Sequence, residues 1–154
     1  MNQENINKIQ NRVIELLNSQ GEEPLNVLVA DCCSEVARLV GGWVQDIEKY
    51  DKFFILKGQN LRNSNRSHDV IAMLKDTKVS VIDPTVWQFF LDKNIFVGNF
   101  GSLEAAFIEL SKIYGGKWEV SEELNNITET QRKQWKSIII KNLNKNIFEL
   151  RQKW

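Results

Sequence analysis

Hydrophobic positions near the start of the chain recur at the spacing of an α-helix. In the segment "QENINKIQNRVIELLNS", residues 3–19, apolar side chains return every three or four positions, which predicts an amphipathic helix. Gly21 and Pro24 follow and are expected to end it. The positions that form the apolar face are Ile6, Ile9, Val13, Ile14, Leu16 and Leu17.

A second helical pattern begins at a pair of cysteines. The short apolar segment "LNVLVADCC" leads into a helix that is predicted from about Cys33 to Val44, with Asp31 as its N-cap. The inward face of this helix is expected to comprise Cys33, Val36, Ala37, Val40 and Val44.

The middle of the chain changes to extended patterns. "KFFILKG", residues 52–58, is rich in aromatic and β-branched residues and predicts a strand. A polar connection separates it from "HDVIAML" and "VSVID", two apolar segments joined by "KDTK", which is typical of an antiparallel hairpin. Pro84 should close the second strand, because proline lacks the N–H of a ladder bond and holds Asp83 extended.

Helical patterns return in the C-terminal part. "TVWQFFLDKN" is irregular or a single helical turn, and residues 102–116 predict a helix capped by Ser102 and ended by Gly115–Gly116. "KWEVSEE" is a candidate short strand, and residues 128–153 predict a last helix. Helices, then strands, then helices indicate the α+β class. The inward positions expected in the last helix are Trp135, Ile138, Ile139, Leu143, Ile147 and Leu150.

Length and charge limit the classes of function. At 154 residues, with 42% hydrophobic and 26% charged residues, the chain suits one globular domain, residues 1–154. Twenty basic residues balance twenty acidic ones, so no net field draws the protein to nucleic acid or to an anionic membrane. No apolar run approaches the ~20 residues of a membrane span, and "MNQENINKIQ" lacks the layout of a secretory signal. The expected location is the cytoplasm, or outside the cell by a route without a cleavable signal peptide.

Cys32 and Cys33 are the two cysteines of the chain, and His68 is its single histidine. A disulfide between adjacent residues requires a strained ring, and a structural zinc site needs about four Cys or His ligands at other spacings. We therefore expect no disulfide, no metal and no cofactor.

Nucleophilic catalysis is the chemistry that this set of residues can support. A thiol is a nucleophile as its thiolate, which the start of a helix and a neighbouring imidazole both favour. Cys33 opens the predicted helix, and His68 is the only imidazole that can serve it. A catalytic imidazole also needs an acceptor on its other nitrogen, and Asp83 at the end of the hairpin is the candidate.

The hairpin register decides how His68 and Asp83 meet. A two-residue turn at Lys75–Asp76 places His68 directly opposite Asp83, with Cβ atoms about 5 Å apart. A register longer by two residues leaves the two residues diagonal, still on one face and within reach of each other.

Each of these residues also has an ordinary structural interpretation. Cys33 on an apolar helix face can be a small core residue, and Cys32, about 100° around the helix, is expected to support the site or to pack. His68 can be a satisfied structural group, and Asp83 before a proline can cap a turn. The joint arrangement of a helix-starting Cys, a strand His and an opposite-strand Asp favours catalysis.

This arrangement resembles the papain-like and transglutaminase-like superfamily of cysteine enzymes, in which a Cys opens a buried helix and His and Asp follow on adjacent strands. "CSEVARLV" resembles that helix, with Val36 and Ala37 three and four positions after Cys33, whereas counting from Cys32 gives a poorer match. "SHDVIAML" resembles the His strand, and "VSVIDPTVWQFF" resembles the acidic segment. "AAFIELSKIYGGKW" is similar to papain-fold toxin domains of bacteria, many of which are inferred to deamidate glutamine.

The resemblance covers roughly residues 26–118. It implies a papain-like core at about 26–120 and a C-terminal helical extension at about 121–154. The first and last helices lie outside the shared pattern and are candidates for binding a partner or gripping the substrate.

The resemblance also implies a catalytic triad of Cys33, His68 and Asp83. Papain-type proteases carry a glutamine before the Cys that helps to bind the oxyanion. In this chain Asn26 is the only amide in that region, so either Asn26 fills the role or backbone N–H groups at the start of the helix do. Cys32 is the expected supporting residue.

The implied function is acyl transfer through a thioester on Cys33, with deamidation of glutamine side chains in a protein target as the favoured outcome. Cysteine peptidase, transglutaminase and peptide-maturation acyltransferase activities use the same residues and stay open. A catalytically inactive papain-like module that binds a protein through the last helix, with Trp135 and Trp154, is a further alternative. The expected partners are a protein or peptide substrate and, for a toxin, a cognate inhibitor or immunity protein.

Overall fold

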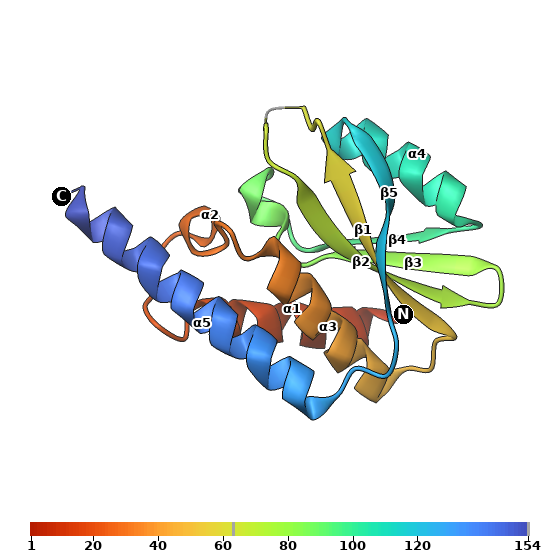
Figure 1. Cartoon of the computed structure of the whole chain (residues 1–154), viewed down its shortest axis with the longest axis horizontal. Coiled ribbons are helices and arrows are strands. Elements are labelled where there is room, and N and C mark those ends of the chain that lie inside the picture. The colour runs from red at the N-terminus through yellow and green to blue at the C-terminus, as the bar shows by residue number, and fades with distance from the viewer. Residues whose placement is uncertain (63, 154) are drawn as a thin grey trace.

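The computed structural model describes residues 1–62 and 64–153, so Trp154 of the docking alternative lies outside the described residues. Within the described part, five α-helices, one short 3₁₀ helix and five strands follow one another along the chain (Figure 1). They are α1 (Gln3–Leu17), α2 (Leu25–Leu28), α3 (Cys33–Ile47), β1 (Lys52–Gln59), β2 (His68–Lys75), β3 (Lys78–Asp83), η1 (Val86–Gln88), β4 (Phe96–Phe100), α4 (Leu103–Tyr114), β5 (Lys117–Leu124) and α5 (Glu129–Gln152).

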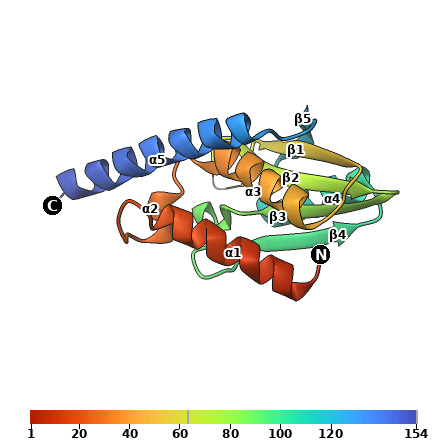
Figure 2. The same ribbon diagram turned by 90° about the horizontal axis from the view of Figure 1, so that it is seen from below.

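The strands form one antiparallel sheet in the order β4-β3-β2-β1-β5. Helices α1, α3 and α5 pack on one face of the sheet, and α4 covers the other face (Figures 1 and 2). The α+β class that the patterns predict is therefore observed. The N-terminal end of α3 lies at the same end of the sheet as the start of β2 (Figure 1).

Side chains of β2 alternate between two cores. Ile71 and Met73 pack with the layer of α1, α3 and α5, whereas Val70 and Ala72 pack with α4. Because the strand is buried on both faces, its segment "VIAML" is a continuous apolar run and not an alternating one. The alternation puts His68, two residues before Val70, on the α4 face.

Four helices follow the predicted patterns closely. Helices α1, α3, α4 and α5 begin and end within three residues of the expected positions. Ser102 caps α4 by accepting a hydrogen bond from the Ala105 N–H at 3.1 Å, and Thr128 forms a capping box with Gln131 at the start of α5. Gly115 ends α4 with a φ of 78°, a conformation that suits glycine.

Three local features differ from the sequence expectations. The N-cap of α3 is Cys32 and not Asp31, because Asp31 adopts a left-handed φ of 61° and its carboxylate bonds Arg66. Helix α2 and strand β4 have no counterpart among the predicted elements. They are four and five residues long, too short to produce a periodic signal.

The β2–β3 hairpin has the longer of the two registers considered. Lys75 pairs with Lys78, so the turn begins at Asp76, one position later than predicted. Asp76 adopts a φ of 56°, which Asp tolerates better than Lys, and this preference explains the shift. The prediction that His68 lies directly opposite Asp83 is wrong, and the two are diagonal.

The buried face of α5 is rotated relative to the prediction. Ile139, Leu143 and Ile147 are buried as expected, but Ile138 is 42% exposed and Asn146 is buried. The buried positions follow an i, i+4 line along one side of the helix, which leaves position 138 about 100° away. This line packs against α3 and α2.

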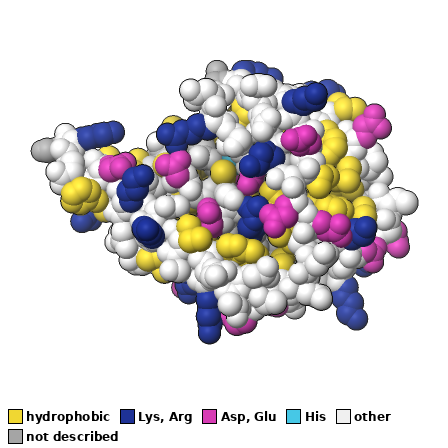
Figure 3. All heavy atoms as spheres, in the orientation of Figure 1, with side chains coloured by type: hydrophobic (Ala, Val, Ile, Leu, Met, Phe, Trp, Pro, Cys, Tyr) yellow, Lys and Arg dark blue, Asp and Glu magenta, His cyan; other side chains and the backbone are white. Residues whose placement is uncertain are grey.

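The surface carries both signs of charge. Basic and acidic side chains are interspersed over the face drawn in Figure 3. Among the described helices, none combines the length and the apolar character that crossing a membrane requires.

Candidate active site

His68 and Asp83 meet on the α4 face of the sheet. His68 is the first residue of β2 and Asp83 is the last residue of β3, and both are fully buried. The His68 Nε2 atom lies 2.8 Å from Asp83 Oδ2. The predicted relation between imidazole and carboxylate is present, and it orients the ring through Nε2.

The Asp83 carboxylate is surrounded by donors. Its Oδ2 atom also accepts a hydrogen bond from the Tyr114 hydroxyl at the end of α4. Its Oδ1 atom accepts hydrogen bonds from the Thr85 N–H at 3.0 Å and from the Thr85 hydroxyl at 3.5 Å. Burial and the adjacent carboxylate raise the pKa of Tyr114 far above its ordinary value, so its hydroxyl stays a donor. The carboxylate is thus fixed in one orientation.

Three aromatic rings enclose the imidazole. The ring centroids of Phe89, Tyr114 and Trp118 lie 4.8, 5.6 and 6.4 Å from that of His68. Trp118 can lie here because its partner on β1 is Gly58, where a Cβ would come within 2.5 Å of the indole. Gly58 also pairs with His68 on β2, so the indole and the imidazole occupy neighbouring strand positions.

Cys33 lies close to the imidazole of His68. Cys33 is the first residue of α3 and is partly exposed. The His68 Nδ1 atom is buried and makes no hydrogen bond of ordinary geometry with any described residue. The thiol is close enough to act on the imidazole through hydrogen bonding and charge.

Opposing influences set the charge of His68. Burial disfavours the imidazolium, but the charge and hydrogen bond of Asp83, together with Cys33, outweigh it and raise the pKa of His68 to about 10. The raised pKa favours the protonated form of the ring. An imidazolium in this position can stabilise a thiolate and can donate a proton to a leaving group.

Cys32 belongs to the core between the helices and not to this site. It is fully buried, and its thiol donates to the Leu28 carbonyl at 3.6 Å. Burial, followed by the charges of Glu35, Cys33 and Asp31, raises the pKa of the Cys32 thiol to about 12. The thiol thus packs beneath the segment that carries the nucleophile candidate.

Helix α5 holds the segment that leads into Cys33. Asn146 donates from Nδ2 to the carbonyl oxygens of Leu28 at 3.2 Å and Ala30 at 2.7 Å. Asn142 donates to the Asp31 carbonyl at 3.1 Å. The C-terminal helix therefore positions the start of α3, a role that the sequence patterns do not indicate.

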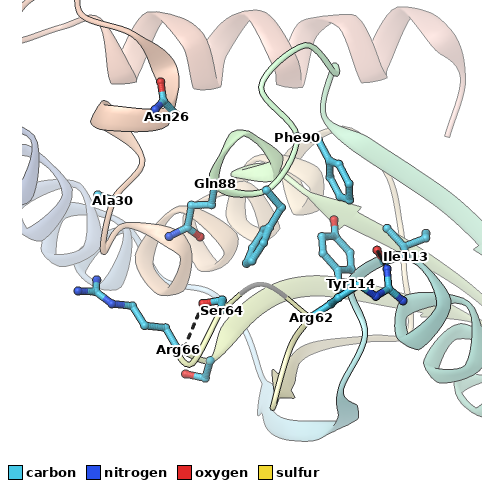
Figure 4. Close-up of a pocket in the computed structure, with 11 residues that line it drawn as sticks. Asn26, Ala30, Arg62, Ser64, Arg66, Gln88, Phe90, Ile113 and Tyr114 are labelled. Carbon is cyan, nitrogen blue, oxygen red and sulfur yellow. Dashed lines mark hydrogen bonds between the residues drawn. The ribbon is translucent and has the colours of Figure 1, made fainter.

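A cavity of about 310 Å³ lies beside two of the aromatic rings that surround His68, and its described lining does not include Cys33, His68 or Asp83 (Figure 4). Its walls come from α2, the β1–β2 connection, η1 and the end of α4. Phe89 and Tyr114, which contact His68 and Asp83, form part of the wall. The described lining includes two arginines, Arg62 among them, and no acidic side chain.

Two amides line this cavity at different places. Asn26, the candidate oxyanion donor, is exposed on α2 and lies across the cavity from Tyr114 (Figure 4). Gln88 lies on η1, next to Phe89, and its carboxamide extends toward the segment between Ala30 and α3 (Figure 4). The structure therefore brings Gln88, and not Asn26, toward the group of residues around His68.

Sequence reasoning missed three residues of this site: Thr85, Gln88 and Tyr114. The signal for Thr85 and Gln88 was present in "DPTVWQFF", because a turn after Asp83 returns both toward the carboxylate and the ring. The signal for Tyr114 was its position as the last residue before Gly115. The role of each residue follows from the way η1 and α4 pack on the sheet, which the local sequence does not indicate.

No group of three or more His, Cys, Asp or Glu side chains suited to a metal ion occurs within residues 1–62 and 64–153. The function therefore has to be inferred from the geometry of the site and from the resemblance of its segments. Comparisons of the chain with protein-family models, with curated proteins and with solved structures found no match.

Proposed function

We propose that the protein is a cysteine-dependent amide hydrolase with a papain-like core that deamidates glutamine side chains of a protein or peptide. Cys33 is the nucleophile, His68 is the acid and base, and Asp83 positions the imidazole. The observation that carries the proposal is the 2.8 Å contact of His68 Nε2 with Asp83 Oδ2, with Cys33 close enough to the ring to influence its charge.

The environment of the imidazole supports a catalytic role over a structural one. A structural histidine buried on a strand normally has both ring nitrogens satisfied. In this protein Nδ1 of His68 lacks an ordinary partner among the described residues, and Cys33, a partly exposed residue, lies close to the ring. This arrangement suits proton exchange between the thiol and the ring.

The first half-reaction forms a thioester. The Cys33 sulfur bonds to the carbonyl carbon of the substrate amide, and the proton that it gives up is held on His68. The carbon–nitrogen bond breaks as His68 donates a proton to the departing nitrogen. Ammonia leaves when the amide is a glutamine side chain.

Water resolves the thioester in the second half-reaction. His68 takes a proton from the water, whose oxygen bonds to the carbonyl carbon, and the carbon–sulfur bond breaks to return Cys33. The glutamine side chain becomes a carboxylic acid. Asp83 keeps the ring in one orientation through both halves.

The start of α3 supplies backbone donors for the carbonyl oxygen. The first N–H groups of this 15-residue helix have no partner within the helix, and the positive end of its dipole lies here. Because Cys33 is the first helical residue, negative charge on the tetrahedral oxygen develops beside these groups.

Two observations favour a glutamine side chain over a main-chain amide. The cavity of about 310 Å³ that Phe89 and Tyr114 help to line is bounded by four segments, which suits a single side chain. The segment "IYGGKW", which resembles part of the deamidating toxin domains, contributes Tyr114 and Trp118 to the surroundings of His68. Both residues of this segment therefore lie next to the imidazole that the proposed reaction uses.

Intact-mass spectrometry of a glutamine-rich test protein checks the proposal. Unfolded casein incubated with the protein is expected to gain about one dalton for each deamidated residue. A Cys33→Ala variant is the matched control and should leave the mass unchanged. Fragments would instead indicate a peptidase, joined chains would indicate a transglutaminase, and an unchanged mass would contradict the proposed activity.

A further inference from the structure

Gln88 occupies a fixed place in the wall of the cavity. It ends η1, five residues after Asp83 on the same turn. Its neighbour Trp87 is buried and donates from Nε1 to the Lys93 carbonyl at 2.7 Å. Its other neighbour, Phe89, packs its ring 4.8 Å from that of His68. The backbone of Gln88 is thus held on both sides, one residue before the ring that packs on the imidazole.

The carboxamide of Gln88 has no partner for its oxygen. The Oε1 atom is buried and accepts no hydrogen bond from any described residue. The side chain lines the cavity and extends toward Ala30, near the start of α3 (Figure 4). A buried acceptor without a donor is unfavourable and rare in folded proteins, so a ligand donor in the cavity would relieve it.

We propose that Gln88 recognises the primary carboxamide of the substrate through two reciprocal hydrogen bonds. The Gln88 Nε2–H donates to the substrate carbonyl oxygen, and Gln88 Oε1 accepts from the substrate N–H. This inference rests on the proposed function and specifies its substrate class as a primary amide.

The geometry of amides explains why this pairing selects a side chain. A primary carboxamide presents its carbonyl oxygen and one N–H on the same edge, so it can meet the edge of another carboxamide with both bonds. A trans peptide bond carries its C=O and N–H on opposite edges and can make only one of the two bonds at a time. Gln88 therefore favours deamidation over peptide cleavage.

The pairing is compatible with the chemistry at the carbonyl. The Nε2–H donor stays on the carbonyl oxygen as negative charge develops there, in addition to the backbone donors of α3. The acceptor Oε1 holds one N–H of the leaving group, and the nitrogen lone pair remains free to take the proton from His68. Gln88 is thus a substrate-binding residue that touches both atoms of the reacting amide.

A pair of small substrates tests the contact. Benzyloxycarbonyl-Gln-Gly offers the primary carboxamide, and the γ-methyl ester of benzyloxycarbonyl-Glu-Gly offers the same carbonyl without an N–H. The measurement is kcat/KM for each substrate with the wild-type protein and with Gln88→Met, which keeps the length of the side chain and removes both hydrogen bonds. Gln134→Met, at an exposed position of α5, is the matched control.

The ratio of kcat/KM for amide over ester is expected to fall about tenfold in Gln88→Met and to stay unchanged in Gln134→Met. A Gln88→Glu variant keeps the acceptor, so its ratio should lie between those of the wild type and Gln88→Met. Both variants are checked for folding by thermal unfolding, and the ratio is read within each variant, so a loss of folded protein affects both substrates alike.

Two results would overturn the inference, and they are distinguishable. Equal losses of kcat/KM on the amide and the ester in Gln88→Met would show that Gln88 does not bind the substrate N–H. This result would leave the proposed function intact. Absence of turnover of both substrates by the wild-type protein would contradict the proposed function and this inference together.

Discussion

Cys32 and Cys33 are adjacent in the chain, yet their surroundings have little in common. Cys32 is fully buried, donates to the Leu28 carbonyl, and has a pKa raised to about 12 by burial and nearby negative charge. Cys33 is partly exposed at the first position of α3, and it lies close enough to His68 to contribute to the raised pKa of the imidazole.

The difference shows that position on the helix, and not residue type, separates a packing thiol from a candidate nucleophile. Consecutive helical residues point about 100° apart, so one step along α3 moves a thiol from the core to the imidazole. Burial favours the neutral thiol of Cys32, whereas Cys33 lies at the partly exposed first position of α3.

Replacing each cysteine by alanine should give the largest contrast. Cys33→Ala is expected to lower turnover by at least about 10⁴-fold, because the thioester cannot form. Cys32→Ala should stay within about threefold of wild-type turnover but lose about 1 to 2 kcal/mol of stability, because a buried sulfur is removed. Deamidation rates measure the effect on turnover, and denaturant unfolding measures the effect on stability. If Cys32→Ala loses turnover and Cys33→Ala keeps it, the roles of the two thiols are reversed.

Asp83→Asn should give the next largest effect. The change keeps the size of the side chain but removes the negative charge that orients the imidazole of His68 and favours its protonated form. Turnover is therefore expected to fall about 10³-fold. Tyr114→Phe, which removes one of the hydrogen bonds to the same carboxylate, should cost only about tenfold. Steady-state kinetics of both variants check the order, and near-normal activity of Asp83→Asn would mean that another group holds the ring.

Stability should depend on pH through His68. Its folded pKa is raised from 6.5 to about 10, so the native state binds more protons than the unfolded state between these values. The stabilisation is fully present below pH 6.5 and is lost as pH rises toward 10, with a slope of up to about 1.4 kcal/mol per pH unit.

Denaturant unfolding of the wild type and of His68→Gln between pH 6.5 and 8.5 isolates this contribution. Cys32 adds a loss of the same sign only above its ordinary pKa of 9.0, so it does not interfere in the chosen window. The wild type should lose stability with rising pH across this window, and the variant should lose distinctly less. Parallel curves would show that His68 does not carry the raised pKa.

The smallest effect is expected from the contacts that α5 makes with the segment before Cys33. Asn146→Ala removes the donor from the carbonyls of Leu28 and Ala30, which should lower stability by about 1 to 3 kcal/mol. Turnover should fall a few-fold, because the start of α3 is held less firmly. Asn144→Ala, at an exposed position of the same helix, is the control and should change neither quantity.

Local signals in the sequence were enough for the elements that carry the site. Periodicity identified α3 and the hairpin strands, and a proline after Asp83 marked the end of β3. The relation between His68 and Asp83 was predictable because residues on one face of a hairpin stay on that face in either register. The exact register was not, because it depended on which residue of "KDTK" takes the left-handed conformation.

The remainder of the site depends on contacts between distant segments. Tyr114 reaches Asp83 from α4, and Asn146 reaches Ala30 from α5, across long separations in sequence. Asn26 was a reasonable oxyanion candidate by sequence position, but the structure leaves it exposed across the cavity from Tyr114, whereas Gln88 directly precedes Phe89, whose ring packs on the imidazole. Such contacts follow from packing of the helices on the sheet and leave no local pattern.

Limited alkylation of the native protein tests most directly whether His68 activates Cys33. With substoichiometric iodoacetamide at pH 7, peptide mapping should find the label on Cys33 with Cys32 unmodified, and His68→Gln should slow the labelling of Cys33 about tenfold. Labelling of Cys32 first, or a labelling rate of Cys33 that His68→Gln leaves unchanged, would contradict the account.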